Sequence, residues 1–533
     1  MKKYTTFLFS IVFCFNCFSQ IKFQKTYKIY GESSGLVVPT NDGLGYFLEV
    51  TTIDSTISYY DVCIAKINLY GDTLWTKVYG GGGSKGFSKI YEDSNGGATM
   101  IGTSYVFGSG SLDSYIVRIN SVGDTLWTKA IGNTLYNATL NSIKLNNGDF
   151  LILTFTDSTG IGLNDVGLIK VDSSGNILWN KFYEGGAGDN GAMSGFVQLS
   201  DGGFIMSGNT NSFGAGDYDA YVIRVDSLGS VIWAKTYGGA QGEAGTGLAL
   251  CSDGVLVASS TNGFGQGGYD IYIIKLDFNG NIMWAKAYGT AIDEGATKIK
   301  QTSDNGFIIG GLYGVITGDR GEMIMKIDSL GNFQWAKSYG SSTCNDDFNN
   351  LSLTSDGGFI ISGTSCSFGG SEFNAYIIKT DSLGNSGCNE QNRTFTEMDI
   401  TSLLTVTNPT PNVYIDASIV AKNTQTTVYN PGLITNTLCF TTDVNETEKL
   451  KDEFKIYPNP NNGNFNLKYK LKQDEAGIVN IMDITGKLVL SYALEKNENN
   501  LSIYSNELNN GVYLFQIVIN GNVVSADKLI IIK

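Results

Sequence analysis

The chain has 533 residues, of which 42% are apolar and 12% aromatic, so it carries enough apolar material for packed domains rather than disorder. Its net charge of −15 argues against a nucleic-acid partner held through phosphate contacts. The sequence contains no histidine, which excludes Ser-His-Asp triads, Cys-His pairs and histidine-ligated metal sites. Chemistry based on carboxylate, lysine or tyrosine stays open. We expect no metal and no cofactor.

Residues 1–19 are typical of a secretory signal peptide. Lys2 and Lys3 precede an apolar run at 7–15, and cleavage after Ser19 would leave Cys17 and Ser19 at the −3 and −1 positions. The run is too short for a transmembrane helix, and no later stretch reaches 18 apolar residues. We therefore expect an exported chain with no transmembrane segment after processing.

Every tryptophan lies in one recurring phrase, exemplified by "GDTLWTKVYG" and "GNFQWAKSYG". Successive tryptophans are 51 to 54 residues apart, and a fixed period of this length is the signature of a repeat architecture. The repeat positions are Trp75, Trp127, Trp179, Trp233, Trp284 and Trp335. We expect these side chains to pack repeats together rather than to contact a ligand.

One repeat contains four short strand patterns, at 284–289, 296–304, 306–314 and 322–329. Asp-Gly and Asn-Gly dipeptides between apolar runs predict tight hairpin turns. Four antiparallel strands in about 50 residues are typical of a β-propeller blade.

The ends of the repeat region predict how the ring closes. Seven fourth strands are present but only six tryptophans, and Cys388 stands where the seventh tryptophan would follow. Near the N-terminus, Phe23 occupies the tryptophan position of the phrase "FQKTYKIYG". An N-terminal strand that completes the last blade is what a closed ring requires. The sequence therefore predicts an all-β chain with a seven-bladed β-propeller over residues 20–388.

The fourth strand of each repeat carries one basic residue. One hypothesis is a ring of anion-binding sites. We favour an ion pair with an acid five residues earlier, at Asp61, Asp113, Asp165, Asp219 and Asp270, because a charge in mid-strand needs a partner. The basic residues are Lys66, Arg118, Lys170, Arg224, Lys275, Lys326 and Lys379.

The loops that lead into each new blade carry acids at similar offsets. One hypothesis is that they ring the mouth of the channel and bind a cation or a polyhydroxyl ligand. The alternative is that they are ordinary polar loops or carboxylates that accept backbone N–H bonds. No Asp-x-Asp-x-Asp-Gly calcium loop occurs. The candidate ligand-binding residues are Asp189, Glu243, Asp293, Glu294, Asp346 and Asp347.

Six cysteines follow the signal region, and disulfides are permitted in an exported chain. Cys344 and Cys366 flank a predicted hairpin, so we expect them to pair. Cys388 with Cys439 would tie the end of the repeats to the following segment. Connectivity does not follow from sequence, so both pairs are hypotheses. Cys63 and Cys251 are expected to be buried thiols.

Residues 389–452 are polar and rich in Thr and Asn, which indicates a spacer or linker with some β structure. The region 454–533 has alternating strands typical of a small β-sandwich. It contains "YPNPNNGNF", "DITGKLV" and "LNNGVYLFQI" before a terminal "KLIIIK". These motifs, in this order, resemble the type A sorting domain of the Bacteroidetes type IX secretion system. The motif residues are Tyr457, Pro458, Asn459, Pro460, Gly486, Lys487, Gly511 and Tyr513.

The resemblance implies an Ig-like domain that the secretion machinery reads and removes, leaving the protein on the surface or in the medium. The repeats also resemble secreted repeat proteins of the same bacteria, without implying an activity. We favour a non-catalytic module that binds a glycan or a surface protein. The alternatives are a polysaccharide hydrolase or lyase acting through carboxylates such as Asp293 and Asp346, and a structural matrix component.

Overall fold

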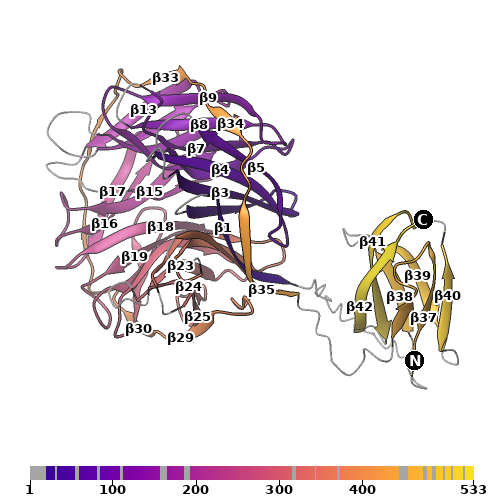
Figure 1. Ribbon diagram of the computed structural model, residues 1–533. Helices are drawn as coiled ribbons and strands as arrows, with labels where there is room; N and C mark the ends of the chain where they lie inside the picture. Colours follow the sequence, from indigo (N-terminus) through magenta and orange to yellow (C-terminus); the bar gives the residue numbers. More distant parts are fainter. Residues whose placement is uncertain are drawn as a thin grey trace, which may run out of the picture. The chain divides into compact units, whose positions relative to one another are not determined.

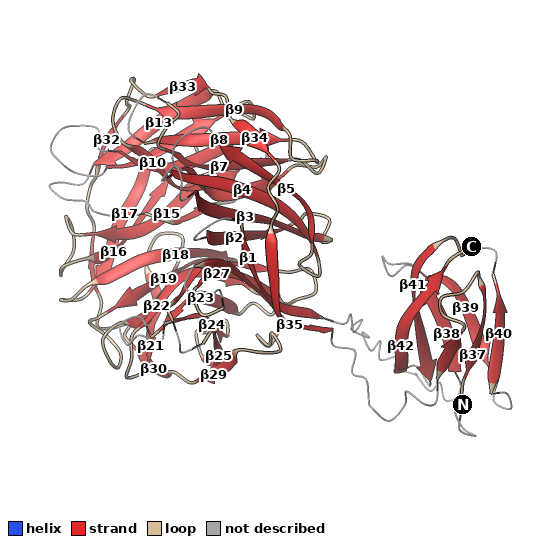
Figure 2. Ribbon diagram, in the orientation of Figure 1, coloured by secondary structure: helices blue, strands red, loops and turns tan. Residues whose placement is uncertain are grey.

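The computed structural model describes residues 20–29, 33–54, 59–80, 85–108, 112–156, 165–184, 193–314, 320–341, 344–368, 373–442, 454–471, 477–482, 488–495, 499–505, 508–519 and 522–533. The proposed signal peptide lies outside these ranges. Contacts divide the chain into two units, which meet in the sequence between Thr441 and Thr442. Every regular element in the described residues is a β-strand, so the all-β prediction is confirmed (Figure 2). None of the described residues forms a helix with the length and apolarity that a membrane crossing needs.

The first unit contains 28 strands before Cys388. They are β1 (Ile21–Lys28), β2 (Ser33–Pro39), β3 (Gly45–Asp54), β4 (Tyr59–Asn68), β5 (Thr73–Gly80), β6 (Lys85–Glu92), β7 (Ala98–Ser104), β8 (Asp113–Ile119), β9 (Thr125–Gly132), β10 (Asn137–Lys144), β11 (Phe150–Thr156), β12 (Asp165–Val171), β13 (Ile177–Glu184), β14 (Gly195–Gln198), β15 (Phe204–Thr210), β16 (Asp219–Val225), β17 (Val231–Gly238), β18 (Glu243–Cys251), β19 (Gly254–Thr261), β20 (Asp270–Leu276), β21 (Ile282–Gly289), β22 (Glu294–Gln301), β23 (Phe307–Tyr313), β24 (Gly321–Ile327), β25 (Phe333–Tyr339), β26 (Asp346–Leu353), β27 (Phe359–Ser365) and β28 (Asn374–Thr380).

These strands form seven sheets, which we number in chain order from the sheet that begins with β2. In sheets 1 to 6, four consecutive strands pair as neighbours, such as β10-β11-β12-β13 in sheet 3. Contacts link each sheet to the next, and β2 of sheet 1 contacts β26, β27 and β28 of sheet 7. The seven sheets therefore form a closed cycle of contacts, which we call the array (Figure 1).

A separate hydrophobic cluster lies at each boundary between neighbouring sheets. Alternate residues of one strand supply opposite clusters, because successive side chains of a strand point to opposite faces. Phe47 packs toward sheet 2 and its neighbour Leu48 toward sheet 7; in sheet 6, Ile308 and Ile309 divide in the same way. Both faces of each sheet are buried, which explains why the central strands are almost continuously apolar.

The N-terminal strand completes sheet 7, as expected. β1 pairs antiparallel with β28, and Phe23 lies opposite Lys379. The tryptophans have the same register, exemplified by Trp75 opposite Lys66 and Trp335 opposite Lys326. Phe23 thus occupies the seventh tryptophan position, and the prediction of an N-terminal closing strand is confirmed.

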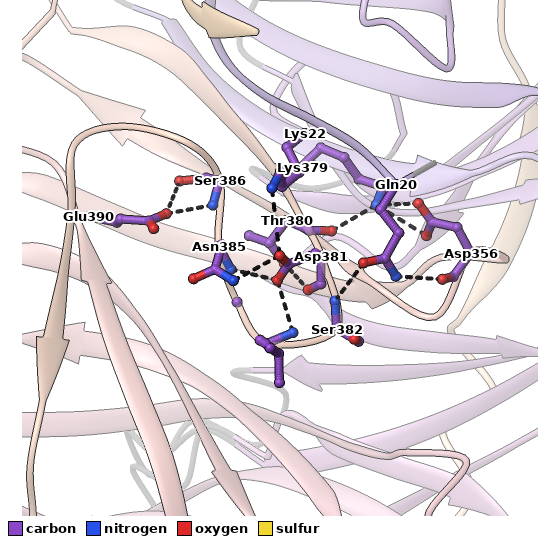
Figure 3. Close-up of polar contacts among 12 residues, drawn as sticks. Gln20, Lys22, Asp356, Lys379, Thr380, Asp381, Ser382, Asn385, Ser386 and Glu390 are labelled. Carbon is purple, nitrogen blue, oxygen red and sulfur yellow. Dashed lines mark hydrogen bonds and ion pairs between the residues drawn. The ribbon is translucent and has the colours of Figure 1, made fainter. Parts of the chain in front are cut away.

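Polar contacts secure this seam (Figure 3). The Lys22 ammonium lies 3.7 Å from the Asp381 carboxylate, and the Gln20 amide donates to the backbone oxygen of Asp356 at 2.7 Å. Gln24 is fully buried, and its amide donates to Ser386 Oγ while accepting from the Tyr376 hydroxyl. These bonds join residues more than 330 positions apart in the sequence.

The tryptophan phrase links each sheet to the turn that enters the next sheet. Trp284 is half-buried, and a Cβ added to Gly331 would lie 2.8 Å from its ring, so only glycine fits there. Two residues later, Lys286 donates to Asn332 Oδ1 at 2.9 Å. Tyr288 is fully buried and its hydroxyl donates to the Gly331 carbonyl at 2.5 Å. The expectation that these tryptophans pack repeats together agrees with this geometry.

The segment expected to be a spacer supplies a fifth strand to every sheet. Its strands are β29 (Glu390–Arg393), β30 (Thr396–Asp399), β31 (Thr405–Thr407), β32 (Asn412–Tyr414), β33 (Val420–Asn423), β34 (Thr427–Tyr429) and β35 (Ile434–Thr442). They pair in turn with sheets 6, 5, 4, 3, 2, 1 and 7, so this segment runs around the array in the reverse of chain order. We call residues 388–442 the belt; it is the orange segment in Figure 1.

The belt has more β structure than we expected of a spacer or linker. The tryptophan strand is not the edge of its sheet, because β21, for example, pairs with β20 on one side and β30 on the other. The strands in residues 390–442 cap the edges that the tryptophan strands would otherwise present. The sequence did not reveal these strands, because the segment is polar and rich in Thr, and short edge strands need few apolar side chains.

Both predicted disulfides are present, Cys344–Cys366 and Cys388–Cys439, and Cys63 and Cys251 are buried thiols. The second bridge joins the first residue of the belt to its last strand.

The predicted ion pairs are wrong in their partner. Residues five apart in a strand point to opposite faces, so the mid-strand base cannot reach that acid. It pairs instead with an acid at a hairpin turn, as Lys275 does with Asp253 at 2.7 Å. The other pairs are Lys66–Glu92, Arg118–Asp93, Lys170–Asp149, Arg224–Asp201, Lys326–Asp304 and Lys379–Asp356.

The second unit has two sheets around one hydrophobic core. One sheet has the order β36-β37-β40 and the other β39-β38-β41-β42. The strands are β36 (Lys455–Tyr457), β37 (Asn464–Lys468), β38 (Gly477–Met482), β39 (Leu488–Leu494), β40 (Asn500–Tyr504), β41 (Gly511–Ile519) and β42 (Asn522–Ile531).

Candidate binding face and pocket

One end of the array carries the loops that sequence reasoning selected. In each sheet the first strand begins and the second strand ends at this side, which we call the loop face. Glu243, Glu294 and Asp346 are the first residues of β18, β22 and β26, so the structure places these acids at equivalent positions. Asp189 lies outside the described residues.

The acids of the loop face are buried. Glu243 and Glu294 have no exposed surface, and Asp293 is only 7% exposed. Glu243 accepts from the Gly239 N–H and the Thr261 hydroxyl, both at 2.9 Å, and Asp293 accepts from the Tyr269 N–H at 2.7 Å. These contacts match the alternative in which carboxylates satisfy loop backbone.

The remaining two acids also have partners within the protein. Asp346 is fully buried and accepts from the Ser367 hydroxyl at 3.0 Å. Asp347 forms an ion pair with Arg320. No group of three or more acids or cysteines in the described part of the chain could hold a metal ion.

Each of three boundaries brings two carboxyl groups together. Glu243 lies near Asp219, Glu294 near Asp270, and Asp346 near Glu322. Burial, reinforced by the neighbouring acids, raises the pKa of Glu294 to about 7, and that of Asp270 to about 6. These groups therefore hold protons at mildly acidic pH and are unsuited to face a cation.

The boundary between sheets 2 and 3 contains an open pocket. The cavity has a volume of about 460 Å³, within the range of small-molecule sites. Its wall comes from the beginning of β6, the end of β7 and the beginning of β10. The lining residues are Lys85, Gly86, Phe87, Ser88, Gly102, Thr103, Tyr105, Leu112, Tyr136, Ala138 and Thr139.

Two tyrosines stand at this pocket. Tyr105 is 58% exposed. Tyr136 is held from behind by the Phe155 ring, whose centroid lies 5.1 Å away, and its backbone forms a β-bridge with Leu112. Burial and the neighbouring Tyr105 raise the pKa of Tyr136, so the Tyr136 phenol is a neutral hydrogen-bonding group. One aromatic ring is thus fixed and the other faces solvent.

Lys85 is the first residue of β6, whereas β18, β22 and β26 begin with an acid and β10 begins with Asn137. Its side chain has no exposed surface, and its ammonium lies 3.8 Å from Asp61 and 5.1 Å from the centre of the Phe107 ring. Burial lowers its pKa, and Asp61 partly opposes this. The positive charge is therefore engaged within the protein.

Sequence reasoning did not select the pocket tyrosines. A signal was present, because the second strand is followed by Asn in "TNSFG" and "TNGFG" but by Tyr105 in "SYVFG".

In the second unit, Tyr457 ends β36, Pro458, Asn459 and Pro460 follow it in the connection to β37, and Gly511 and Tyr513 lie in the first three residues of β41. Gly486 and Lys487 are outside the described residues. The Asn459 side chain accepts from the Ile530 N–H at 2.8 Å, and the Asn461 N–H donates to the Ile530 carbonyl at 3.0 Å. The Tyr-Pro-Asn-Pro segment is therefore fastened to the terminal strand β42.

Two comparisons relate this chain to known proteins. The regulatory protein FlaEY of Caulobacter vibrioides (strain ATCC 19089 / CIP 103742 / CB 15) is 28% identical over 164 residues, which is 26% of this chain. The match spans 17% of that protein's own length. Residues 455–533 match the model of the secretion system C-terminal sorting domain, so the second unit carries a sorting domain of the type IX secretion system.

Proposed function

We propose that this protein is a seven-bladed β-propeller, exported by type IX secretion in a bacterium of the Bacteroidetes, that binds a glycan or protein at the cell surface or in the medium. The observation that carries the export is the sorting domain at residues 455–533. A closed cycle of seven sheets with four repeat strands each supports the propeller.

The binding role rests on the loop face. A rigid array holds a formed pocket there with aromatic and hydroxyl groups at its wall. Binding sites on repeat proteins gather on loops that a rigid scaffold positions. The described acids to which a hydrolase or lyase would be assigned, Asp293 and Asp346, are buried in contact with loop groups, which weighs against that alternative.

Deletion of residues 454–533 tests the export. In the native bacterium, the full chain should reach the cell surface or medium, and the truncated chain should stay in the periplasm. A variant with Tyr504→Ala, an exposed residue of the second unit outside the motifs, is the control and should be exported normally. Export of the truncated chain would contradict the proposal.

The purified exported protein tests the binding. We expect saturable capture of a surface glycan or an extracellular protein. If the protein captures neither a surface glycan nor an extracellular protein, this result would favour a role as a structural matrix component instead.

A further inference from the structure

The boundaries between sheets are copies of one arrangement, so they can be compared position by position. Two positions beside each boundary are compared: the residue after the second strand of one sheet and the residue before the first strand of the next sheet. Among the described residues, three such boundaries carry Asn211 with Gly242, Asn262 with Asp293, and Gly314 with Asn345. Sheets 2 and 3 carry Tyr105 with Tyr136 at these positions.

Tyr105 adds little to the packing of the array, although Tyr136 packs against the Phe155 ring. The boundary clusters below the loop face are built from the same kinds of apolar residues at every boundary, and Tyr105 remains 58% exposed. The described equivalents of this position are Asn211, Asn262, Gly314 and Cys366, whereas the exposed Tyr105 offers a ring face and a hydroxyl to solvent.

The pocket beside the tyrosines has further open space. A Cβ added to Gly86 would meet no atom within 4 Å, although Gly86 lies in β6 and lines the cavity. The hydroxyl groups of Ser88 and Thr103 belong to the same wall. A molecule that enters would therefore meet an aromatic ring at one side and short hydroxyl side chains at the other.

The charges nearby are already neutralised or buried. Lys85 is engaged by Asp61 and the Phe107 ring, and Asp113 is only 1% exposed. A charged ligand would find no counter-charge at the wall, and the cost of removing its charge from water would oppose binding. A neutral ligand with both apolar C–H faces and many hydroxyl groups fits the wall best.

We propose that the pocket between sheets 2 and 3 binds one neutral pyranose unit of a saccharide, with its C–H face against Tyr105 and its hydroxyl groups toward Tyr136, Ser88 and Thr103. The inference rests on the proposed binding function and specifies its site and ligand class. The three boundaries compared above carry no tyrosine pair at their described positions and do not take part.

Isothermal titration of the full chain with neutral oligosaccharides tests the inference; the probes are cellohexaose, mannohexaose and a galactose-terminated oligosaccharide. At least one probe should bind with one site per chain. Tyr105→Ala should weaken that binding by about tenfold, because stacking on the ring is lost. Gly86→Phe should abolish it by filling the cavity.

Asn211→Ala, at the position equivalent to Tyr105 in sheet 4, is the matched control and should bind normally. Circular dichroism and thermal unfolding of each variant show whether it is folded; if Gly86→Phe does not fold, Tyr105→Ala and a Thr103→Val variant decide. If all these variants still bind the saccharide, the pocket is not the binding site, but the proposed binding function stands. Binding of only charged glycans or only proteins would overturn the ligand class, and binding of nothing would contradict both proposals.

Discussion

Cys388 and Cys439 are 51 positions apart in the sequence and are joined by a disulfide after the chain between them has passed along all seven sheets. The belt is therefore a covalently closed loop around the array. Non-covalent contacts at the β1–β28 seam close the array itself, and the belt holds that seam from outside through β35, which pairs with β1.

Replacement of both bridge cysteines by serine should loosen the belt. A loop of this length is expected to contribute about 4 kcal/mol to the free energy of unfolding in the chain-entropy model. We expect a lower midpoint of denaturant unfolding and new protease cleavage within 390–439. The Cys344→Ser/Cys366→Ser variant, whose bridge lies within sheet 7, should be destabilised without belt cleavage. A belt that stays protected in the Cys388→Ser/Cys439→Ser variant would show that the bridge does not secure it.

The tyrosine of the repeat phrase supplies a second testable contact. Tyr237 is fully buried and its hydroxyl donates to the Gly280 carbonyl at 2.6 Å. Tyr237→Phe should reduce the free energy of unfolding by about 1 kcal/mol, because the Gly280 carbonyl loses this hydrogen bond and keeps only the Lys235 ammonium at 3.1 Å. Tyr269→Phe, at an exposed tyrosine, is the matched control and should change stability little. If the two variants are equally stable, the hydrogen bond from Tyr237 to Gly280 does not stabilise the contact between sheets.

The N-terminal seam depends on Phe23, which is fully buried. Phe23→Ala should cost about 3–5 kcal/mol of unfolding free energy, since a large side chain is lost from a packed core. Leu74→Ala, at a residue 59% exposed in β5, should cost little. Denaturant unfolding followed by fluorescence measures both. A small effect of Phe23→Ala would mean that β1 contributes little to closing the array.

The buried acids predict an unusual dependence of stability on pH. Burial raises the pKa of Glu294 to about 7, above the usual glutamate value of 4.5. Between these values the folded protein binds more protons than the unfolded chain, so the stability from this group is complete below pH 4.5 and is lost as pH rises toward about 7.

Glu294→Gln should flatten the decline in unfolding free energy across this window, measured by denaturant titrations at several pH values. Asp217→Asn, at an exposed loop residue, is the control and should leave the slope unchanged. A slope that does not respond to Glu294→Gln would show that other groups set the pH dependence.

The sequence was sufficient for the parts of the fold that repeat. The repeat period and the turn dipeptides identified the strands, because each is a local pattern that occurs many times in the chain. Comparison of Phe23 with the recurring tryptophan then identified the closing seam. The sequence offered the two disulfides only as hypotheses, and the structure contains both.

The belt and the pocket did not follow from the sequence. The belt strands are three to nine residues long and gain their conformation from edges supplied elsewhere in the chain, so they carry little local signal. The acids of the loop face looked available for a ligand because burial depends on how neighbouring loops fold over them. Tyr105 and Tyr136 lie 31 positions apart and become neighbours at a boundary that only the tertiary structure brings together.

The most direct test of the account measures binding and turnover in one sample of the exported protein. The purified chain is incubated with surface polysaccharide of the native bacterium and with plant and yeast glucans and mannans, and bound protein and newly formed reducing ends are quantified together. The account predicts saturable binding with no increase in reducing ends over the protein-free control. Reducing ends that accumulate in proportion to the protein added would contradict it.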